Sequence, residues 1–299
     1  MNTYATLISA TELQSLLLRQ KTEQTEQSVR VFDCSFELSR PQAGAEMFAQ
    51  SHIPGAVYAH LDRDLSAAKD PATGKPVEAV SGGRHPLPTR ATFAAWLGSV
   101  GFTHAMQAVV YDRQGANFCG RLWWMFKWLG HENVAVLDGG LQAWQAVGGA
   151  VVGGPASQYL ASHFVPGPAL CALVDTQAVA DALGHGAQTL IDARGAPRFR
   201  GDEEPLDPVA GHIPGALNRP FGQNMDSSGC FKPAHQLKAE FLELLGERDP
   251  ASVVHQCGSG VSAVPNIIAM EVAGLGRSAL YAGSWSAWCA DPNRPVARG

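Results

Sequence analysis

The stretch Ser51-His-Ile-Pro-Gly-Ala56 recurs 160 residues later as Gly211-His-Ile-Pro-Gly-Ala216. Three further landmarks recur in the same order in both halves of the chain. They are Val31-Phe-Asp-Cys-Ser35 with Leu190-Ile-Asp-Ala-Arg194, Val109-Val-Tyr-Asp112 with Val253-Val-His-Gln256, and Asp138-Gly-Gly-Leu-Gln-Ala-Trp144 with Ala282-Gly-Ser-Trp-Ser-Ala-Trp288. Four landmarks in one order indicate an internal duplication.

The repeated His-Ile-Pro-Gly-Ala motif predicts a tight turn. Proline fixes φ and glycine relaxes it, so the pair directs the chain into the next strand. We expect His52 and His212 to hold this turn rather than to act as catalysts. The first copy keeps its histidine although no cysteine follows in the matching place.

Each copy alternates helical and strand patterns. Leu13, Leu16 and Leu17 have the i, i+3, i+4 spacing of an amphipathic helix, and Asp175 is a candidate N-cap in the second copy. Short β-branched runs between such helices are typical of a parallel sheet flanked by helices. We predict a first domain over 1–150, a linker rich in Gly and Pro over 151–171, and a second domain over 172–299.

The composition narrows the classes of partner and compartment. The 299 residues are 45% hydrophobic and carry a net charge of −5, so no basic surface for nucleic acid is expected. No apolar run is long enough for a membrane helix, and the first residues lack the pattern of a secretory signal. The six cysteines include no Cys-X-X-Cys pair, which disfavours a disulfide framework or a metal site. A cytoplasmic location is therefore predicted.

Cys257 lies in the most informative stretch of the chain. A strand is predicted to end at Gln256, and a helix follows in whose first turn Pro265 is tolerated. The loop of residues 257–262 would turn its backbone N–H groups inward, next to the positive end of that helix. This environment favours the thiolate, and it would hold a persulfide and an incoming anion. The other cysteines are better explained as small buried side chains; they are Cys34, Cys119, Cys171, Cys230 and Cys289.

The segment Cys257-Gly-Ser-Gly-Val-Ser-Ala263 resembles the active-site loop of 3-mercaptopyruvate sulfurtransferases. Other motifs, spread over essentially the whole chain, resemble the wider rhodanese family. They are the two His-Ile-Pro-Gly-Ala units, Arg121-Leu-Trp-Trp-Met-Phe-Lys-Trp-Leu-Gly-His131, Asp138-Gly-Gly140 and Gly283-Ser-Trp285. The resemblance implies an α/β fold of tandem duplicated rhodanese-like domains, with the active site in the second.

The resemblance also implies roles for the residues of the loop. Cys257 would be the nucleophile, and the backbone of Gly258, Gly260, Val261 and Ser262 would bind the transferred sulfur and the donor. In the first copy Arg113 stands where the cysteine would be. The N-terminal domain is therefore expected to be catalytically inactive.

Two signals disagree on the sulfur donor. Arg198 matches the family position that binds the anionic end of the substrate, and Arg194 matches a position more often tied into local structure. Mercaptopyruvate enzymes usually carry a second arginine where this chain has Asp207. Thiosulfate enzymes usually carry basic residues directly after the cysteine, where this chain has Gly258 and Ser259. We favour mercaptopyruvate, because the loop touches the reacting sulfur, and keep thiosulfate as the alternative.

Ser259 has a further role by resemblance. In mercaptopyruvate enzymes the matching serine is linked to a histidine and an aspartate, which correspond here to His85 and Asp62. Such a chain would polarise the substrate carbonyl or protonate the leaving enolate. The expected cycle has two half-reactions through a Cys257 persulfide. The acceptor would be cyanide, a thiol or a thioredoxin-like protein, and no metal or organic cofactor is needed.

Two rival functions carry less weight. Cysteine phosphatases of this fold place an arginine six residues after the cysteine, and that position here is Ala263. A rhodanese module that only binds partners often loses the cysteine, whereas Cys257 is present in an intact glycine loop.

Overall fold

The computed structural model describes residues 3–22 and 29–299, which fold into two compact units. The first unit comprises Met1–Ser66, Thr89–Leu170 and Ser227–Cys230, and the second comprises Ala67–Pro88, Cys171–Asp226 and Phe231–Gly299. A segment from the first half of the sequence, 67–88, therefore packs with the second half. The domain boundaries that we predicted from the sequence stay predictions.

The first unit is built on a five-stranded parallel sheet in the order β1-β5-β4-β2-β3. Its strands are β1 (Leu7–Ile8), β2 (Val29–Asp33), β3 (Val57–Tyr58), β4 (Gln107–Tyr111) and β5 (Val134–Leu137). Three of these strands, β2, β4 and β5, are short runs rich in β-branched residues that are buried throughout, as is typical of parallel sheets.

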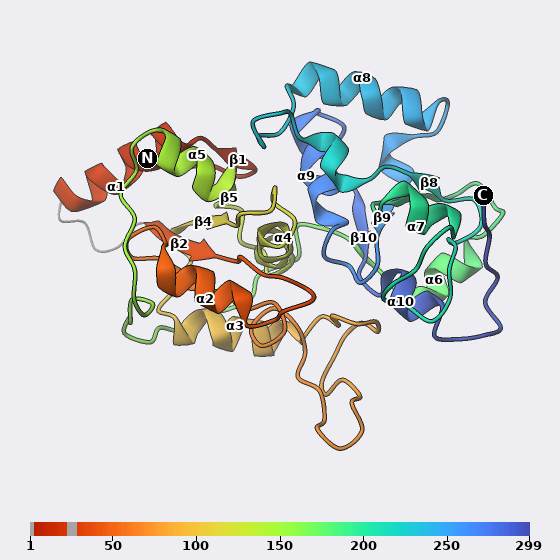
Figure 1. Ribbon diagram of the computed structural model, residues 1–299, viewed down its shortest axis with the longest axis horizontal. Helices are drawn as coiled ribbons and strands as arrows, with labels where there is room; N and C mark the ends of the chain where they lie inside the picture. The colour runs from red at the N-terminus through yellow and green to blue at the C-terminus, as the bar shows by residue number, and fades with distance from the viewer. Residues whose placement is uncertain (1–2, 23–28) are drawn as a thin grey trace. The chain divides into compact units, whose positions relative to one another are not determined.

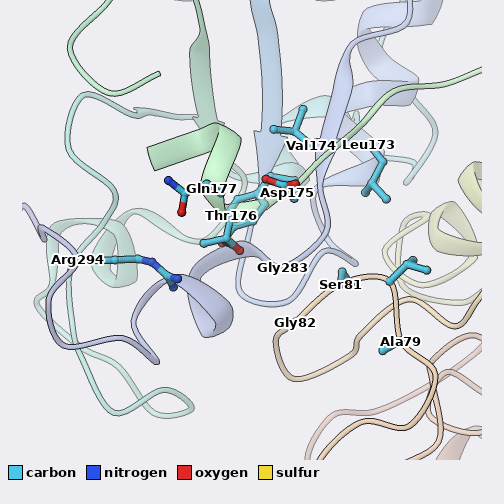
Figure 2. A pocket seen from close by; sticks show the side chains of 12 residues that line it. Ala79, Ser81, Gly82, Leu173, Val174, Asp175, Thr176, Gln177, Gly283 and Arg294 are labelled. Carbon is cyan, nitrogen blue, oxygen red and sulfur yellow. Dashed lines mark hydrogen bonds between the residues drawn. The ribbon is translucent and has the colours of Figure 1, made fainter. Parts of the chain in front are cut away.

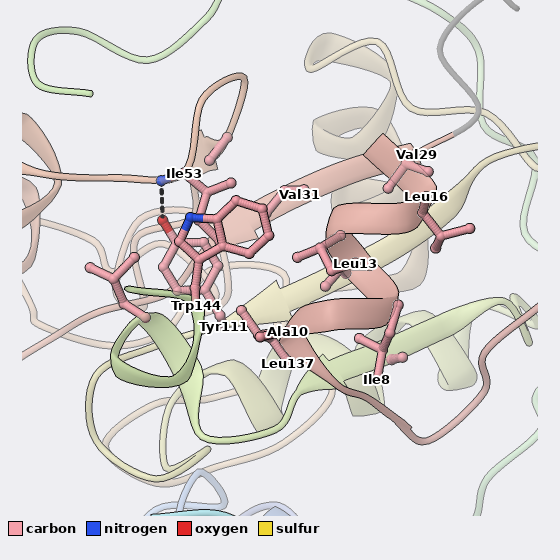
Figure 3. Packing of buried hydrophobic residues seen from close by; sticks show 14 of the residues in the cluster. Ile8, Ala10, Leu13, Leu16, Val29, Val31, Ile53, Tyr111, Leu137 and Trp144 are labelled. Atoms are coloured by element: carbon pink, nitrogen blue, oxygen red, sulfur yellow. Dashed lines mark hydrogen bonds between the residues drawn. The ribbon is translucent and has the colours of Figure 1, made fainter. Parts of the chain in front are cut away.

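Helices cover both faces of this sheet. Side chains from α1 (Ala10–Thr22), α2 (Ala43–Gln50) and α5 (Gly140–Ala146) pack with alternate strand residues in one apolar cluster (Figure 3). On the opposite face Phe32 of β2 contacts Phe126 of α4 (Cys119–Trp128), and Phe93 of α3 (Arg90–Ser99) contacts the same ring. The alternation of strand side chains between two helical layers is the physical basis of this unit's core.

The second unit again has helices packed around a sheet, and strands β8, β9 and β10 of that sheet are labelled in Figure 1. The sheet is parallel, in the order β6-β10-β9-β7-β8. Its strands are β6 (Leu173–Val174), β7 (Thr189–Asp192), β8 (Leu217–Asn218), β9 (Val253–Gln256) and β10 (Ala279–Tyr281). Its helices are α6 (Thr176–Asp181), α7 (Ala196–Arg200), α8 (Ala234–Leu245), α9 (Val264–Val272) and α10 (Ser284–Trp288), with 3₁₀ turns at Phe221–Asn224 and Pro250–Ser252. The predicted duplication of an α/β domain is confirmed.

The two faces of the second sheet are covered as in the first unit. Residues of α6, α7 and α10 pack against one face in a single buried cluster. On the other face His255 of β9 lies against Phe241 of α8 and Met270 of α9. The N-cap prediction for Asp175 is also confirmed, because its side chain accepts a hydrogen bond from the Ala178 N–H at 2.8 Å.

The two His-Ile-Pro-Gly-Ala turns are held in the same way. The ring of His52 stacks on Phe48 with centroids 3.8 Å apart, and its Nδ1 lies 2.8 Å from the Phe48 carbonyl oxygen. His212 repeats both contacts with Phe199, at 3.8 Å and 2.8 Å. Both imidazoles are buried and used by the turn, so the structural role predicted for them is confirmed.

No helix in the described parts of the chain is both long enough and apolar enough to cross a membrane.

The buried His255 gives a prediction for acid stability. Burial lowers the pKa of this imidazole from 6.5 to about 3, so the unfolded chain binds a proton below pH 6.5 that the native state does not. Stability is therefore lost as the pH falls from 6.5 toward 3. We expect His255 to contribute about 2 kcal/mol of this loss between pH 7 and pH 5. Urea unfolding at both pH values should show a smaller loss in His255→Leu.

The exposed His235 on α8 supplies the control for replacing a histidine. An unchanged pH dependence in His255→Leu, equal to that of wild type and of His235→Leu, would contradict the assignment.

Candidate active site

Cys257 is the first residue after β9, the central strand of the second sheet. The chain turns through residues 257–263 and enters α9 at Val264, with Pro265 in the first turn as predicted. Ligand sites of open α/β sheets lie at the carboxyl ends of the strands, where this loop is found. Cys257 is buried, with 2% of its surface exposed.

The loop is fixed by the turn that follows β10. The N–H of Cys257 donates to Ser284 Oγ at 3.0 Å, and this hydroxyl donates to the Tyr281 carbonyl at 2.9 Å. In return, the N–H groups of Trp285 and Ser286 donate to the carbonyls of Cys257 and Gly258 at 3.0 and 2.9 Å. Two loops at neighbouring strand ends thus hold each other in place. The sequence did not predict the role of Ser284, because a serine in the Gly283-Ser-Trp285 motif carries no sign of its distant partner.

Gly260 is required by close packing as well as by backbone geometry. Its φ is +74°, and a Cβ at this position would lie 2.3 Å from the Ala282 carbonyl oxygen. Only glycine satisfies both demands. The turn of the backbone at Gly260 leaves several N–H groups of the loop without a hydrogen-bond acceptor among the described residues. Within the described chain, those of Gly258, Ser259, Val261 and Ser262 donate to no protein acceptor.

Three of the other cysteines lie in surroundings that disfavour the thiolate. Burial raises the pKa of Cys34 and of Cys119 well above the usual value, with nearby carboxylates adding to the effect. Burial also raises the pKa of Cys289. These thiols are held in the neutral form, which is a poor nucleophile. All six cysteines are free thiols.

Ser259 and His85 meet beside the nucleophile. The Ser259 Oγ and His85 Nδ1 lie 2.7 Å apart, and both side chains are buried. His85 reaches the loop because the segment 67–88 belongs to the second unit. Asp62 lies in the first unit, in the turn after β3, where its N–H donates to His60 Nδ1 at 3.1 Å. The structure thus brings Ser259 and His85 together, and the part of Asp62 stays a prediction.

Arg194 is tied into the fold. Its guanidinium binds Asp192 through Nε and Nη2, the latter at 2.6 Å, and donates from Nη2 to the Gly211 carbonyl at 2.8 Å. Burial acts to lower the pKa of Arg194, but Asp192, Glu204 and Cys257 outweigh this and the pKa is raised. Arg194 therefore joins three segments around the loop and keeps a fixed positive charge near the sulfur.

Arg198 lies on α7, four residues after Arg194, and is more exposed. Its Nε and Nη2 donate to Glu204 at 3.2 and 2.6 Å, and Nη2 also lies 3.2 Å from Asp207. Its side chain is 17% exposed, so it can meet a ligand at the mouth of the loop.

In the first unit Arg113, at the sequence position of Cys257, makes the contacts that Arg194 makes in the second unit. Its guanidinium binds Asp33, which corresponds to Asp192, and the carbonyl of Ser51, which corresponds to Gly211. Ser35 stands in the sequence position of Arg194 and its hydroxyl accepts a hydrogen bond from Arg113. The residue that takes the place of the cysteine thus supplies the cation that this copy otherwise lacks.

The described residues contain no group of three or more His, Cys, Asp or Glu side chains arranged to hold a metal ion. A cavity of about 400 Å³ opens between 79–82, the β6–α6 connection and Arg294, and Gly283 also lines it (Figure 2). Cys257 is not among its lining residues, so this cavity is distinct from the sulfur loop.

Comparison with known proteins decides the family. The rhodanese-like domain model matches residues 10–147 and 175–291. The chain belongs to the rhodanese family.

Its relatives include sulfurtransferases named for both donors. A probable 3-mercaptopyruvate sulfurtransferase of Pseudomonas aeruginosa is 44% identical over 92% of this chain and 94% of its own length. The putative thiosulfate sulfurtransferase SseB of Mycobacterium tuberculosis is 38% identical over 98% of this chain and 97% of its own length. Among solved structures, the 3-mercaptopyruvate sulfurtransferase SseA of Escherichia coli has a TM-score of 0.74 at 27% identity, over 95% of this chain and all of that chain. The predicted rhodanese-type sulfurtransferase class is confirmed.

The packing of Gly260 can be tested with a matched pair of variants. Gly274 also has a positive φ, of +70°, but a Cβ there would meet nothing within 4 Å. Gly274→Ala should therefore cost about 1 kcal/mol of folding free energy from backbone strain alone. Gly260→Ala should cost about 1–3 kcal/mol more, because its methyl group meets a backbone carbonyl.

Chemical denaturation measures both values, and equal losses in the two variants would show that the contact with Ala282 is not restrictive.

Proposed function

We propose that this protein takes the sulfur atom of 3-mercaptopyruvate onto Cys257 and passes it to a thiophilic acceptor. The observation that carries the choice of donor is the 2.7 Å contact between Ser259 and His85 beside the nucleophile. When the carbon–sulfur bond of mercaptopyruvate breaks, the electron pair leaves on pyruvate as an enolate that needs a proton. Thiosulfate releases sulfite, a stable anion that needs none. A buried hydroxyl–imidazole pair serves the first donor and not the second.

In the first half-reaction the Cys257 thiolate attacks the sulfur of the donor. A sulfur–sulfur bond forms, the carbon–sulfur bond breaks, and the enolate takes a proton through Ser259 and His85, with Asp62 as the predicted third member. Arg198 binds the donor's carboxylate, since its planar fork matches a carboxylate with two bonds. Arg194 keeps Asp192 and the loop in position.

In the second half-reaction an acceptor attacks the outer sulfur of the persulfide and releases the Cys257 thiolate. The unused N–H groups of Gly258, Val261 and Ser262, together with the amino-terminal end of α9 and the curl at Gly260, support an anionic persulfide. Cyanide, a thiol or a thioredoxin-like protein stays the predicted acceptor. The N-terminal domain is catalytically inactive in this account, because Arg113 occupies the position of the nucleophile.

A thiosulfate:cyanide sulfurtransferase is the second candidate. Asp207, which stands where mercaptopyruvate enzymes usually have a second arginine, and the relationship to the mycobacterial protein favour it. A module that only binds partners ranks third, because Cys257 is retained. The cytoplasmic location and the lack of nucleic-acid and membrane partners stay predictions from the sequence.

Removing the nucleophile should abolish transfer from either donor. We expect Cys257→Ser to lower kcat/KM by at least about a thousandfold with mercaptopyruvate and with thiosulfate, cyanide being the acceptor. Wild type should prefer mercaptopyruvate. A preference for thiosulfate would make thiosulfate the donor. Activity with neither donor would exclude the enzyme functions and favour a module that only binds partners.

Removing the Ser259 hydroxyl should affect the two donors unequally. We expect Ser259→Ala to lower kcat with mercaptopyruvate about 100-fold, the lower end of what a positioned proton donor contributes, and to change kcat with thiosulfate less than about threefold. Steady-state kinetics with both donors measures this. Equal losses with both donors would mean that Ser259 shapes the loop and moves no proton.

A further inference from the structure

Arg84, the residue before His85, is held against the sulfur loop by contacts at both of its ends. Its N–H donates to Ser286 Oγ at 3.0 Å, and its Nη1 donates to Asp207 Oδ1 at 2.6 Å. The side chain of Arg84 is 25% exposed and that of Asp207 is 4% exposed. The guanidinium is thus fixed in place while part of it still reaches solvent.

Two guanidinium groups converge on the residue that follows the nucleophile. A Cβ built on Gly258 would lie 3.0 Å from Arg84 Nη2, and 3.5 and 3.7 Å from the two Nη atoms of Arg198. The space beside Gly258 is therefore lined by two cations that come from different segments. A side chain at position 258 would compete with the Arg84 fork for this space.

Two carboxylates offset the repulsion between the guanidinium groups of Arg84 and Arg198. Asp207 accepts from Arg84 Nη1 at 2.6 Å and from Arg198 Nη2 at 3.2 Å, and Glu204 accepts from Arg198 Nε and Nη2. Burial acts to raise the pKa of Glu204, but hydrogen bonds from Arg198 and from backbone N–H groups outweigh this and lower it. The carboxylates bind Arg84 through Nη1 and Arg198 through Nε and Nη2, while Arg84 Nη2 and Arg198 Nη1 are the guanidinium atoms nearest to a Cβ at Gly258.

We propose that Arg84 is the second anion-binding residue of the donor site, and that the donor's carboxylate binds beside Gly258 between Arg84 and Arg198. The inference rests on the proposed function and assigns to Arg84 a role in substrate binding. Two planar forks can hold one carboxylate more firmly and in a more defined orientation than one fork can. The bound donor is thereby positioned next to the residue that carries the sulfur.

This assignment explains both departures from the family patterns. Asp207 stands where a second substrate arginine is usual, and here it holds Arg84, which brings the missing charge from the segment 67–88. Thiosulfate enzymes usually carry a basic residue directly after the cysteine. Here that residue is Gly258, and the cation next to it belongs to Arg84.

The test compares two alkylating agents that differ in charge. Iodoacetate and iodoacetamide react with a thiolate in the same way, but only iodoacetate carries a carboxylate. We expect Arg84→Gln to lower the ratio of the iodoacetate rate to the iodoacetamide rate at Cys257 about 10-fold. The iodoacetamide rate itself should stay within about twofold of wild type. Mass spectrometry of the Cys257 peptide separates this reaction from that of other cysteines.

Two further variants serve as controls for charge and for position. Arg84→Lys keeps the charge without the fork, so its ratio should lie between those of wild type and Arg84→Gln. Arg200→Gln removes an exposed arginine that lies on the same helix as Arg198 and forms an ion pair with the exposed Asp202, and it should leave the ratio unchanged. An iodoacetamide rate near that of wild type also shows that the loop of each variant is folded.

Kinetics with mercaptopyruvate then links the site to turnover. Arg84→Gln should raise KM about 10-fold with a smaller change in kcat, because the carboxylate is bound before and after the sulfur moves. An unchanged alkylation ratio in Arg84→Gln would overturn the inference even in an active enzyme. A lowered ratio in a protein that turns over neither donor would uphold the anion site and reject the proposed function.

Discussion

The contact between the loop after β9 and the turn after β10 is the constraint on which the candidate site depends. The Cys257 N–H is bound by Ser284, and Gly260 packs so closely on Ala282 that no side chain fits between them. The two strands are neighbours in the sheet, so the segments that follow their carboxyl ends lie next to each other. The carbonyls of Cys257 and Gly258 bind this turn, and the loop so held leaves several of its own N–H groups without an acceptor among the described residues.

The two copies of the domain share the same fold and differ in which residue supplies the cation that binds the buried aspartate. Both have the same strand order, the same histidine stacked on phenylalanine, and a buried aspartate bound to a guanidinium. A buried carboxylate without a partner is costly, so each copy needs this cation. The second copy takes it from Arg194 and keeps Cys257 free for chemistry. The first copy takes it from Arg113, at the position where the nucleophile would stand.

The sequence was sufficient where the signals are local. The period of the apolar residues, the short β-branched runs and the repeated turn predicted two α/β units, and a glycine loop between a strand and Pro265 predicted the place of Cys257. It was insufficient where residues far apart in the chain meet. Ser259 and His85 are 174 positions apart and came only from family resemblance, and Arg84 and Asp207 are 123 apart and were not foreseen as a pair. Such pairs depend on how the segment 67–88 packs on the second unit, which no local pattern reports.

The central claim is that Cys257 carries the sulfur between donor and acceptor. The most direct measurement is the mass of the Cys257 peptide after the protein has been mixed with mercaptopyruvate in the absence of any acceptor. We expect Cys257 to gain one sulfur atom and to lose it when cyanide is added. An unmodified Cys257 in a protein that releases pyruvate, or the extra sulfur on another cysteine, would contradict it.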